Sequence, residues 1–175
     1  MQIKIFKTLP STNQKAKELA KRGVKPWTVI LAEGQSAGYG KEKIFWFSPR
    51  GGLYFSVVLP KSQIEDLQTL TVLAAFIVAN TLKEKFSLEP LIKLPNDVRL
   101  GRKKVAGILT ENIIGRDVKL SVIGIGLNTN IDKFPKDLED EATSLKIELG
   151  KEVNNQNILE KIVLGLKEQL KTISQ

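Results

Sequence analysis

Apolar and polar residues change their spacing several times along the chain, and each spacing predicts a different element. Residues 2–7 (QIKIFK) alternate between the two classes, which is typical of a half-buried strand. Residues 28–33 (TVILAE) and 52–59 (GLYFSVVL) are short apolar runs and predict buried strands. Residues 91–128 predict further short strands, with Gly115-Arg116-Asp117 as a hairpin turn.

A first helix is predicted to begin after Pro10. Ser11 and Gln14 have the spacing of a capping box, in which a hydroxyl accepts from a backbone N–H and a glutamine reaches back. Gly23 ends the helix, because glycine adopts the left-handed conformation that closes a last turn. Its apolar face is formed by Ala16, Leu19 and Ala20.

Two longer segments follow with helical spacing, over residues 63–86 and 154–173, and residues 143–149 predict a short helix. The apolar stripes that we expect in the core are Leu70, Leu73, Ala74, Ile77, Val78 and Leu82 in the first, and Ile158, Ile162, Leu166 and Leu170 in the second. Strands clustered between helices predict an α+β fold, with a mixed or antiparallel sheet and helices packed on it.

The 175 residues suggest one domain, and 42% of them are hydrophobic, as in ordinary globular proteins. No apolar run is long enough to span a membrane, and the start lacks the pattern of a signal peptide. We therefore expect a cytoplasmic protein and no membrane partner.

The chain has no cysteine and no histidine, which excludes thiolate, Ser–His–Asp and His-based zinc chemistry. Catalysis must then use Lys, Arg, Asp, Glu and backbone amides, which favours positioning and electrostatic stabilisation. A net charge of +8 suits an anionic partner, but scattered lysines on a solvated surface produce the same number.

Residues 34–51 predict a long loop that contains two glycines close together, Gly38 and Gly40. Such glycines let the backbone approach a ligand, and Lys41 adds a charge for a phosphate or carboxylate. The rings of residues 45–47, around Trp46, can cover an adenine or an apolar ligand. A plain surface loop held down by Trp46 explains the same residues.

Residues 93–97 (KLPND) predict a rigid bend at Pro95. Asn96 and Asp97 either start a turn by bonding their own backbone, or hold ribose, phosphate or Mg²⁺ at the end of a strand. In the next strand, alternation places Lys104 with Ala106 and Ile108 on one face, and Lys103 with Val105 and Gly107 on the other. An ammonium on an apolar face suggests an anionic ligand; a lysine at the exposed start of a strand is the alternative.

Two further segments have a structural and a functional interpretation. The glycines of residues 124–128 (GIGLN) indicate a bulge or the close approach of another group. Residues 11–13 (STN) cap a helix or bind ligand oxygens at its N-terminus.

The order of these segments resembles that of biotin–protein ligases. STN, GQSAGYG…WFSPRGGLYFS, KLPND, KKVAGIL, GIGLN and ATSL follow one another as in that family, over about residues 7–150. The resemblance implies a mixed-sheet core like that of class II aminoacyl-tRNA synthetases and biotin/lipoate ligases. It also implies a single catalytic domain over 1–175, with no N-terminal DNA-binding domain and without the small C-terminal β-barrel domain.

The implied reaction has two steps. Biotin and ATP, with Mg²⁺, form biotinyl-5′-AMP, and the biotinyl group is then transferred to a lysine of a biotin carboxyl carrier protein. By position, the residues expected to bind biotin are Ser11, Thr12, Asn13, Gln35, Gly38, Tyr39, Gly40, Lys41 and Lys104. Those expected to bind ATP are Lys41, Trp46, Lys93, Asn96, Asp97 and Asn128. Asp97 is also expected to bind the metal. The expected catalytic residues are Lys104, Lys41, Asp97 and Lys93.

The chain departs from the family pattern at several of these positions. The family loop GRGRxGRxW is here residues 38–46, with Tyr39 and Lys41 in place of two arginines and Lys43-Ile44 in place of Gly-Arg. Lysine lacks the bidentate fork of arginine. Leu94 replaces the tryptophan of KWPND.

Three alternatives stay open. One is a lipoate or octanoate ligase or transferase of the same superfamily, although no RRxxGGG-like segment is present. Another is a non-catalytic paralogue that binds biotin, which the altered loop favours. Nucleic-acid binding rests on the net charge alone, and we expect no nucleic-acid partner.

We expect a homodimer, as is usual in the family, with strands near 118–128 available for pairing.

Overall fold

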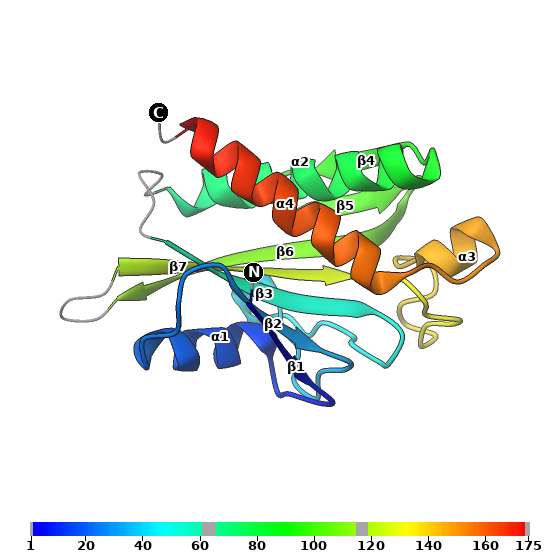
Figure 1. Ribbon diagram of the computed structural model, residues 1–175. Helices are drawn as coiled ribbons and strands as arrows, with labels where there is room; N and C mark the ends of the chain where they lie inside the picture. The colour runs from blue at the N-terminus through cyan, green and yellow to red at the C-terminus, as the bar shows by residue number, and fades with distance from the viewer. Residues whose placement is uncertain (1, 61–65, 115–118, 174–175) are drawn as a thin grey trace.

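The computed structural model describes residues 2–60, 66–114 and 119–173, and its strands form one seven-stranded mixed sheet in the order β1-β2-β3-β7-β6-β5-β4 (Figure 1). β1 and β2 are parallel, since helix α1 crosses over between them, and all other neighbours are antiparallel. This confirms the predicted α+β class. The strands are β1 Gln2–Phe6, β2 Thr28–Ala32, β3 Leu53–Leu59, β4 Pro90–Lys93, β5 Asp97–Leu100, β6 Lys103–Ile114 and β7 Lys119–Leu127.

The helices cover the two faces of the sheet unequally. α2 and α4 lie over one face, and α1 lies on the opposite face, where it contacts β2, β3 and β7 (Figure 1). Of the helices in the described ranges, none is both long enough and apolar enough to cross a bilayer. Their bounds are α1 Thr12–Lys21, α2 Leu67–Phe86, α3 Leu145–Leu149 and α4 Asn155–Ile173.

Each central strand therefore has two buried faces. Val57 of β3 packs in the core with α2 and α4, whereas its neighbour Val58 packs in the smaller core with α1. All seven residues of β3 are buried, which explains its continuous apolar run. The stripe predicted for residues 154–173 is buried along α4, as expected.

The helix boundaries follow local signals. The Ser11 hydroxyl caps α1 by accepting from the Gln14 N–H, and Gly23, at a φ of +81°, follows the last turn. α2 begins after Asp66, whose carboxylate accepts from the backbone of Gln68 and Thr69. The predicted start of this helix at residue 63 and the predicted turn at 115–117 lie outside the described residues.

One expectation about assembly is wrong. β7 is not available to pair with a second chain, because β3 and β6 occupy both of its edges. The outer strands of the sheet are β1 and β4. Sequence pattern could not show this, since β7 pairs with β3 across more than sixty intervening residues.

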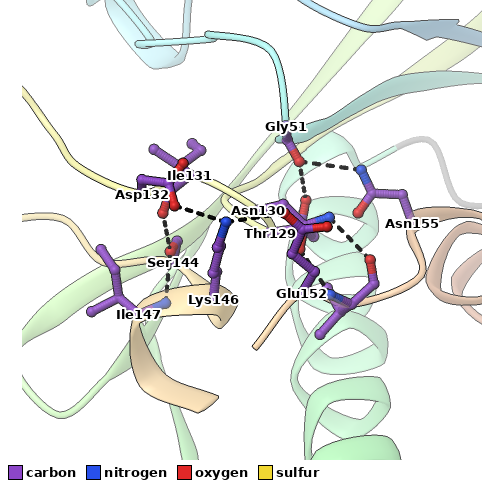
Figure 2. A network of polar contacts seen from close by, with 11 residues as sticks. Gly51, Thr129, Asn130, Ile131, Asp132, Ser144, Lys146, Ile147, Glu152 and Asn155 are labelled. Atoms are coloured by element: carbon purple, nitrogen blue, oxygen red, sulfur yellow. Dashed lines mark hydrogen bonds and ion pairs between the residues drawn. The ribbon is translucent and has the colours of Figure 1, made fainter. Parts of the chain in front are cut away.

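A polar network fixes the segment that follows β7 (Figure 2). The Asn130 side chain accepts from the Val153 N–H at 2.8 Å and donates to the Val153 carbonyl at 3.0 Å. The carbonyl of Gly51, just before β3, accepts from the Thr129 hydroxyl at 2.7 Å and from the Asn155 amide at 3.2 Å. The end of β7, the start of β3 and the start of α4 are thereby joined.

We predict that Asn130→Ala lowers the free energy of unfolding by about 2–3 kcal/mol, because two backbone groups of Val153 lose their partner in a partly buried site. Urea denaturation measures this, and the slope m should not change. The control is Asn157→Ala, an exposed asparagine on α4, which should stay within about 0.5 kcal/mol of the original protein. Equal effects of the two substitutions would contradict the role of the network.

Candidate functional site

Two neighbouring cavities open on the α1 side of the sheet, where the helix leaves the strands uncovered. The larger, of about 300 Å³, lies under the loop of residues 38–46 and reaches from Asn13 to Lys104. The smaller, of about 220 Å³, extends from Lys104 to Asn128 and Phe134. The walls that the two share are Ile44, Phe45, Trp46, Asp97 and Lys104.

Lys104 reaches this face because β6 contains a bulge. Arg99 of β5 pairs with Lys104 and Val98 pairs with Ala106, so Val105 is an extra residue. The extra residue inverts the alternation, and Lys104 lies on the same face as Gly107, within 3.4 Å of the position that a Cβ there would take. The prediction that Lys104 shares a face with Ala106 and Ile108 is therefore wrong.

The ammonium of Lys104 is held between an acid and a ring. It lies 2.6 Å from the Asp97 carboxylate, and its Nζ lies 5.0 Å from the centre of the Trp46 ring. The indole N–H of Trp46 is buried and has no hydrogen-bond partner within the described part of the chain. A positive charge and an unused donor therefore meet at the junction of the two cavities.

Glycines form the floor of the larger cavity. A Cβ at Gly126 would collide with the Trp46 indole, and a Cβ at Gly124 would collide with the Asn13 carboxamide. The predicted close approach in GIGLN is thus confirmed, and the β7 register runs through it without a bulge.

The residues expected at the biotin end are brought together around the start of α1. The Thr12 N–H donates to the Gln35 side chain at 2.8 Å, and the Ser56 hydroxyl donates to Asn13 Oδ1 at 2.6 Å. Thr12, Asn13 and Gln35 line the larger cavity. Ser11 does not line it and acts as the helix cap.

The loop of residues 38–46 folds back on itself over the cavity. The backbone N–H of Trp46 donates to the Gly38 carbonyl at 2.9 Å, and the backbone N–H of Gly40 donates to the Ile44 carbonyl at 2.8 Å. Gly38 packs against Gln35 and Ser48 and does not line the larger cavity. Its wall is formed in part by Tyr39, Gly40 and Lys41. The ammonium of Lys41 is largely exposed.

Residues 93–97 form the outer wall through a cis Leu94–Pro95 peptide. Asn96 and Asp97 line the larger cavity, and the Asn96 carbonyl accepts from the Ile108 N–H at 2.9 Å. Lys93 is exposed beyond both cavities, although it pairs with Asp97 across β4 and β5. The described residues contain no cluster of three acids, so a Mg²⁺ at Asp97 would need phosphate oxygens to complete its ligands.

Asn128 lies in the smaller cavity, apart from the other expected residues. Its amide donates to the Thr143 carbonyl at 3.0 Å, while its Oδ1 is buried and has no partner in the described ranges. Phe47 and Phe134 lie in the same cavity with their ring centres 6.0 Å apart. Flat rings and one free acceptor suit a heterocycle that carries an amine.

Sequence reasoning missed several residues of the site. Arg99 lines the smaller cavity and forms no ion pair with the described carboxylates. It follows Asp97 by two positions on one strand, so strand alternation could have identified it. Glu111 does not line either cavity, but it binds Asn13 and Tyr39, which line the larger one.

The chain is similar to known proteins in both sequence and fold. The model of the biotin/lipoate A/B protein ligase family matches residues 5–128. The chain is 36% identical over 161 residues to the bifunctional ligase/repressor BirA of Bacillus subtilis, with 89% of this chain and 50% of that protein aligned. It is 35% identical over 122 residues to the biotin–[acetyl-CoA-carboxylase] ligase of Paracoccus denitrificans, with 67% of this chain and 50% of that protein aligned. The chain thus spans about half the length of these relatives.

Solved structures show the same architecture. The biotin protein ligase of Aquifex aeolicus, in complex with biotin and ATP, superposes with a TM-score of 0.89 at 32% identity, over 99% of this chain and 72% of that one. The biotin protein ligase of Leishmania major, in complex with biotinyl-5-AMP, superposes with a TM-score of 0.80 at 25% identity, over 98% and 75%. The mixed sheet with its helices is therefore the fold of biotin protein ligases.

We predict that Gly126→Ala displaces the Trp46 indole from the sheet and lowers the free energy of unfolding by about 1–3 kcal/mol through overpacking. In a Trp27→Phe background, the emission of Trp46 should shift to longer wavelength as the ring becomes hydrated. Gly124→Ala is the matched control, because its new methyl group meets Asn13 and not Trp46. A similar emission shift in both variants would contradict the assigned contact.

Proposed function

The chain belongs to the biotin/lipoate A/B protein ligase family, and we propose that it activates biotin with ATP to biotinyl-5′-AMP and then transfers the biotinyl group to a lysine of a biotin carboxyl carrier protein. The observation that carries this proposal is the position of Lys104 at the junction of the two cavities. One cavity would hold the acid, the other would hold the nucleotide, and the reacting groups would meet at the ammonium.

Charge is the main obstacle to the first step. A carboxylate must attack an α-phosphate, so two anions approach each other. The ammonium of Lys104 lies where both can contact it, and its contact with Asp97 orients it before the substrates arrive. Lys41, on the wall of the larger cavity, is a further cation that we assign to the phosphates and to catalysis. Lys93 lies beyond both cavities, and the family resemblance alone supports a role for it there.

The acid end of the larger cavity suits biotin better than a plain acyl chain. Thr12, Asn13 and Gln35 present hydroxyl and carboxamide groups there. These side chains already bond to groups of the protein such as Ser56, Glu111 and Ser48, and a saturated octanoyl chain could add no hydrogen bond to them. Biotin carries hydrogen-bonding groups in its ring head, so it can add such bonds.

The smaller cavity suits adenine. The free Oδ1 of Asn128 can accept from an exocyclic amine, and Trp46 and Phe134 offer rings at the walls. We assign Mg²⁺ to Asp97, with Asn96 beside it, and with the phosphates of ATP supplying the remaining ligands. Gly38, Gly40 and Tyr39 belong to the loop that covers the acid.

The assembly and the location of the protein also belong to the proposal. We propose a homodimer in the cytoplasm, with the family resemblance as the support for both. Sedimentation equilibrium in the presence and absence of biotin and ATP measures the assembly.

One assay tests the function directly. The protein is mixed with ATP, Mg²⁺, labelled biotin and an apo carrier domain, and we expect the label on the carrier lysine. Incorporation of lipoate and not of biotin would assign the chain to the other branch of its family. Tight binding of biotin without release of pyrophosphate would instead show a binding protein without ligase activity.

We predict that Lys104→Ala slows single-turnover release of pyrophosphate by about 100-fold or more, because a preorganised charge at the reacting oxygens is lost. Lys103→Ala is the control: the Lys103 ammonium donates to the carbonyl of Glu139, and we expect the rate to stay within about twofold. An unchanged rate in Lys104→Ala would refute its role.

A further inference from the structure

The carboxylate of Glu111 joins three elements beneath the larger cavity. One oxygen lies 2.7 Å from the ammonium of Lys17 on α1. The other accepts from the Asn13 amide at 2.9 Å and from the Tyr39 hydroxyl at 3.1 Å. Glu111 is on β6, and Tyr39 belongs to the loop over the cavity, so the sheet, the helix and the loop meet at one side chain.

The contacts of Glu111 favour its ionised form. Burial alone would raise the pKa of its carboxyl, but the bonds from Lys17, Asn13 and Tyr39 outweigh burial and hold the pKa below its ordinary value. Burial likewise would lower the pKa of Lys17, and its bond to Glu111 raises that pKa instead. The contacts are therefore complete above the ordinary pKa of a glutamate, about 4.3, and are lost only as the pH falls below it.

The loop has few other bonds to the sheet. Among the described residues, the bond from Tyr39 to Glu111 is the one side-chain hydrogen bond between residues 39–45 and any strand. The ring of Tyr39 is also covered by the ammonium of Lys43 at 3.8 Å, which orients it within the loop. Glu42 and Lys43 adopt positive φ angles of 57° and 62°, so the tip of the loop is not in a relaxed conformation. The bond from Tyr39 to Glu111 attaches the base of this tip to the sheet.

We propose that Glu111 is a positioning residue that holds Tyr39 and Asn13 on the cavity wall and so keeps the loop of residues 38–46 closed before a ligand enters. Glu111 itself touches neither cavity, so it acts through these two residues. The identity of the ligand as biotin rests on the proposed function. If the wall is already in place, less conformational entropy is lost when the ligand binds. We therefore expect Glu111 to raise the affinity of the protein for the acid.

A purely structural role makes a different prediction. If Glu111 only attaches α1 to β6 through Lys17, then Tyr39→Phe changes nothing, because the bonds to Lys17 and Asn13 remain. Loss of the Tyr39 hydroxyl separates the two roles, since it removes one bond to the loop and leaves the helix attached.

The first experiment uses the ligand-free protein and needs no activity. Hydrogen exchange, followed by mass spectrometry, measures the peptide of residues 38–47. We expect Tyr39→Phe and Glu111→Leu, which leaves the Tyr39 hydroxyl without its acceptor, to speed exchange in this peptide by about 3- to 10-fold, the value for loss of one hydrogen bond. The matched control is Tyr54→Phe, because the Tyr54 hydroxyl is buried and has no partner in the described part of the chain; it should leave exchange in the loop unchanged.

The double variant gives a sharper result. Because Tyr39→Phe and Glu111→Leu break the same bond to the loop, their effects on loop exchange should not add. Unchanged exchange in Tyr39→Phe, or full additivity in the double variant, would overturn the proposal. Urea denaturation of each variant shows whether a global loss of stability accounts for faster exchange, in which case peptides of α2 would speed up equally and the proposal would also fail.

Kinetics then connect the loop to the acid. In Tyr39→Phe, we expect the KM for biotin to rise about 3- to 10-fold while kcat stays within about twofold, and the KM for ATP to change less than the KM for biotin. A fall in kcat at unchanged KM for biotin would contradict a positioning role. If the unchanged protein has no ligase activity, the proposed function fails, while the exchange experiment still decides the role of Glu111.

Discussion

The ion pair between Lys104 and Asp97 depends on one extra residue in strand β6. Without the bulge at Val105, strict alternation would direct the lysine into the core beneath α2, where an ammonium has no partner. With the bulge, the ammonium lies 2.6 Å from a carboxylate at a partly open wall. The pair is worth little as a source of stability, since desolvation offsets most of its attraction. Its consequence is placement: a fixed positive charge stands between two cavities.

The rest of the site follows from how little covers this face of the sheet. α1 packs against β2, β3 and β7, and past its N-terminus the strands carry glycines in place of large side chains. Gly107 and Gly126 leave room for the Trp46 ring, and Gly124 leaves room for Asn13. The opposite face, under α2 and α4, is packed with large apolar residues and holds the sheet rigid. A rigid floor with small residues is thus combined with walls that come from loops.

In the loop of residues 38–46, Tyr39 and Lys41 stand where the family pattern has two arginines. These two side chains differ in what they contact. The Tyr39 hydroxyl bonds to Glu111, whereas Lys41 remains largely in solvent. A hydroxyl and a carboxylate attach the loop to the sheet, and the charge of Arg99 lies in the smaller cavity without an acid partner among the described residues. The cationic groups of the site are therefore distributed differently from the family loop pattern, around the same central lysine.

Local sequence determined much of this protein. The cap at Ser11, the buried stripe of α4 and the apolar run of β3 all follow from interactions within a few residues, so periodicity and capping signals predict them. The order of motifs along the chain likewise placed Thr12, Asn13, Gln35, Asn96, Asp97 and Lys104 in one site, and they do line one cavity. Tertiary structure decided three things: the face on which Lys104 lies, the interior place of β7 and the role of Glu111. The reason is physical, because one unpaired residue reverses the direction of every later side chain, and contacts such as that of Asn13 with Glu111 join residues 98 positions apart, for which no local pattern exists.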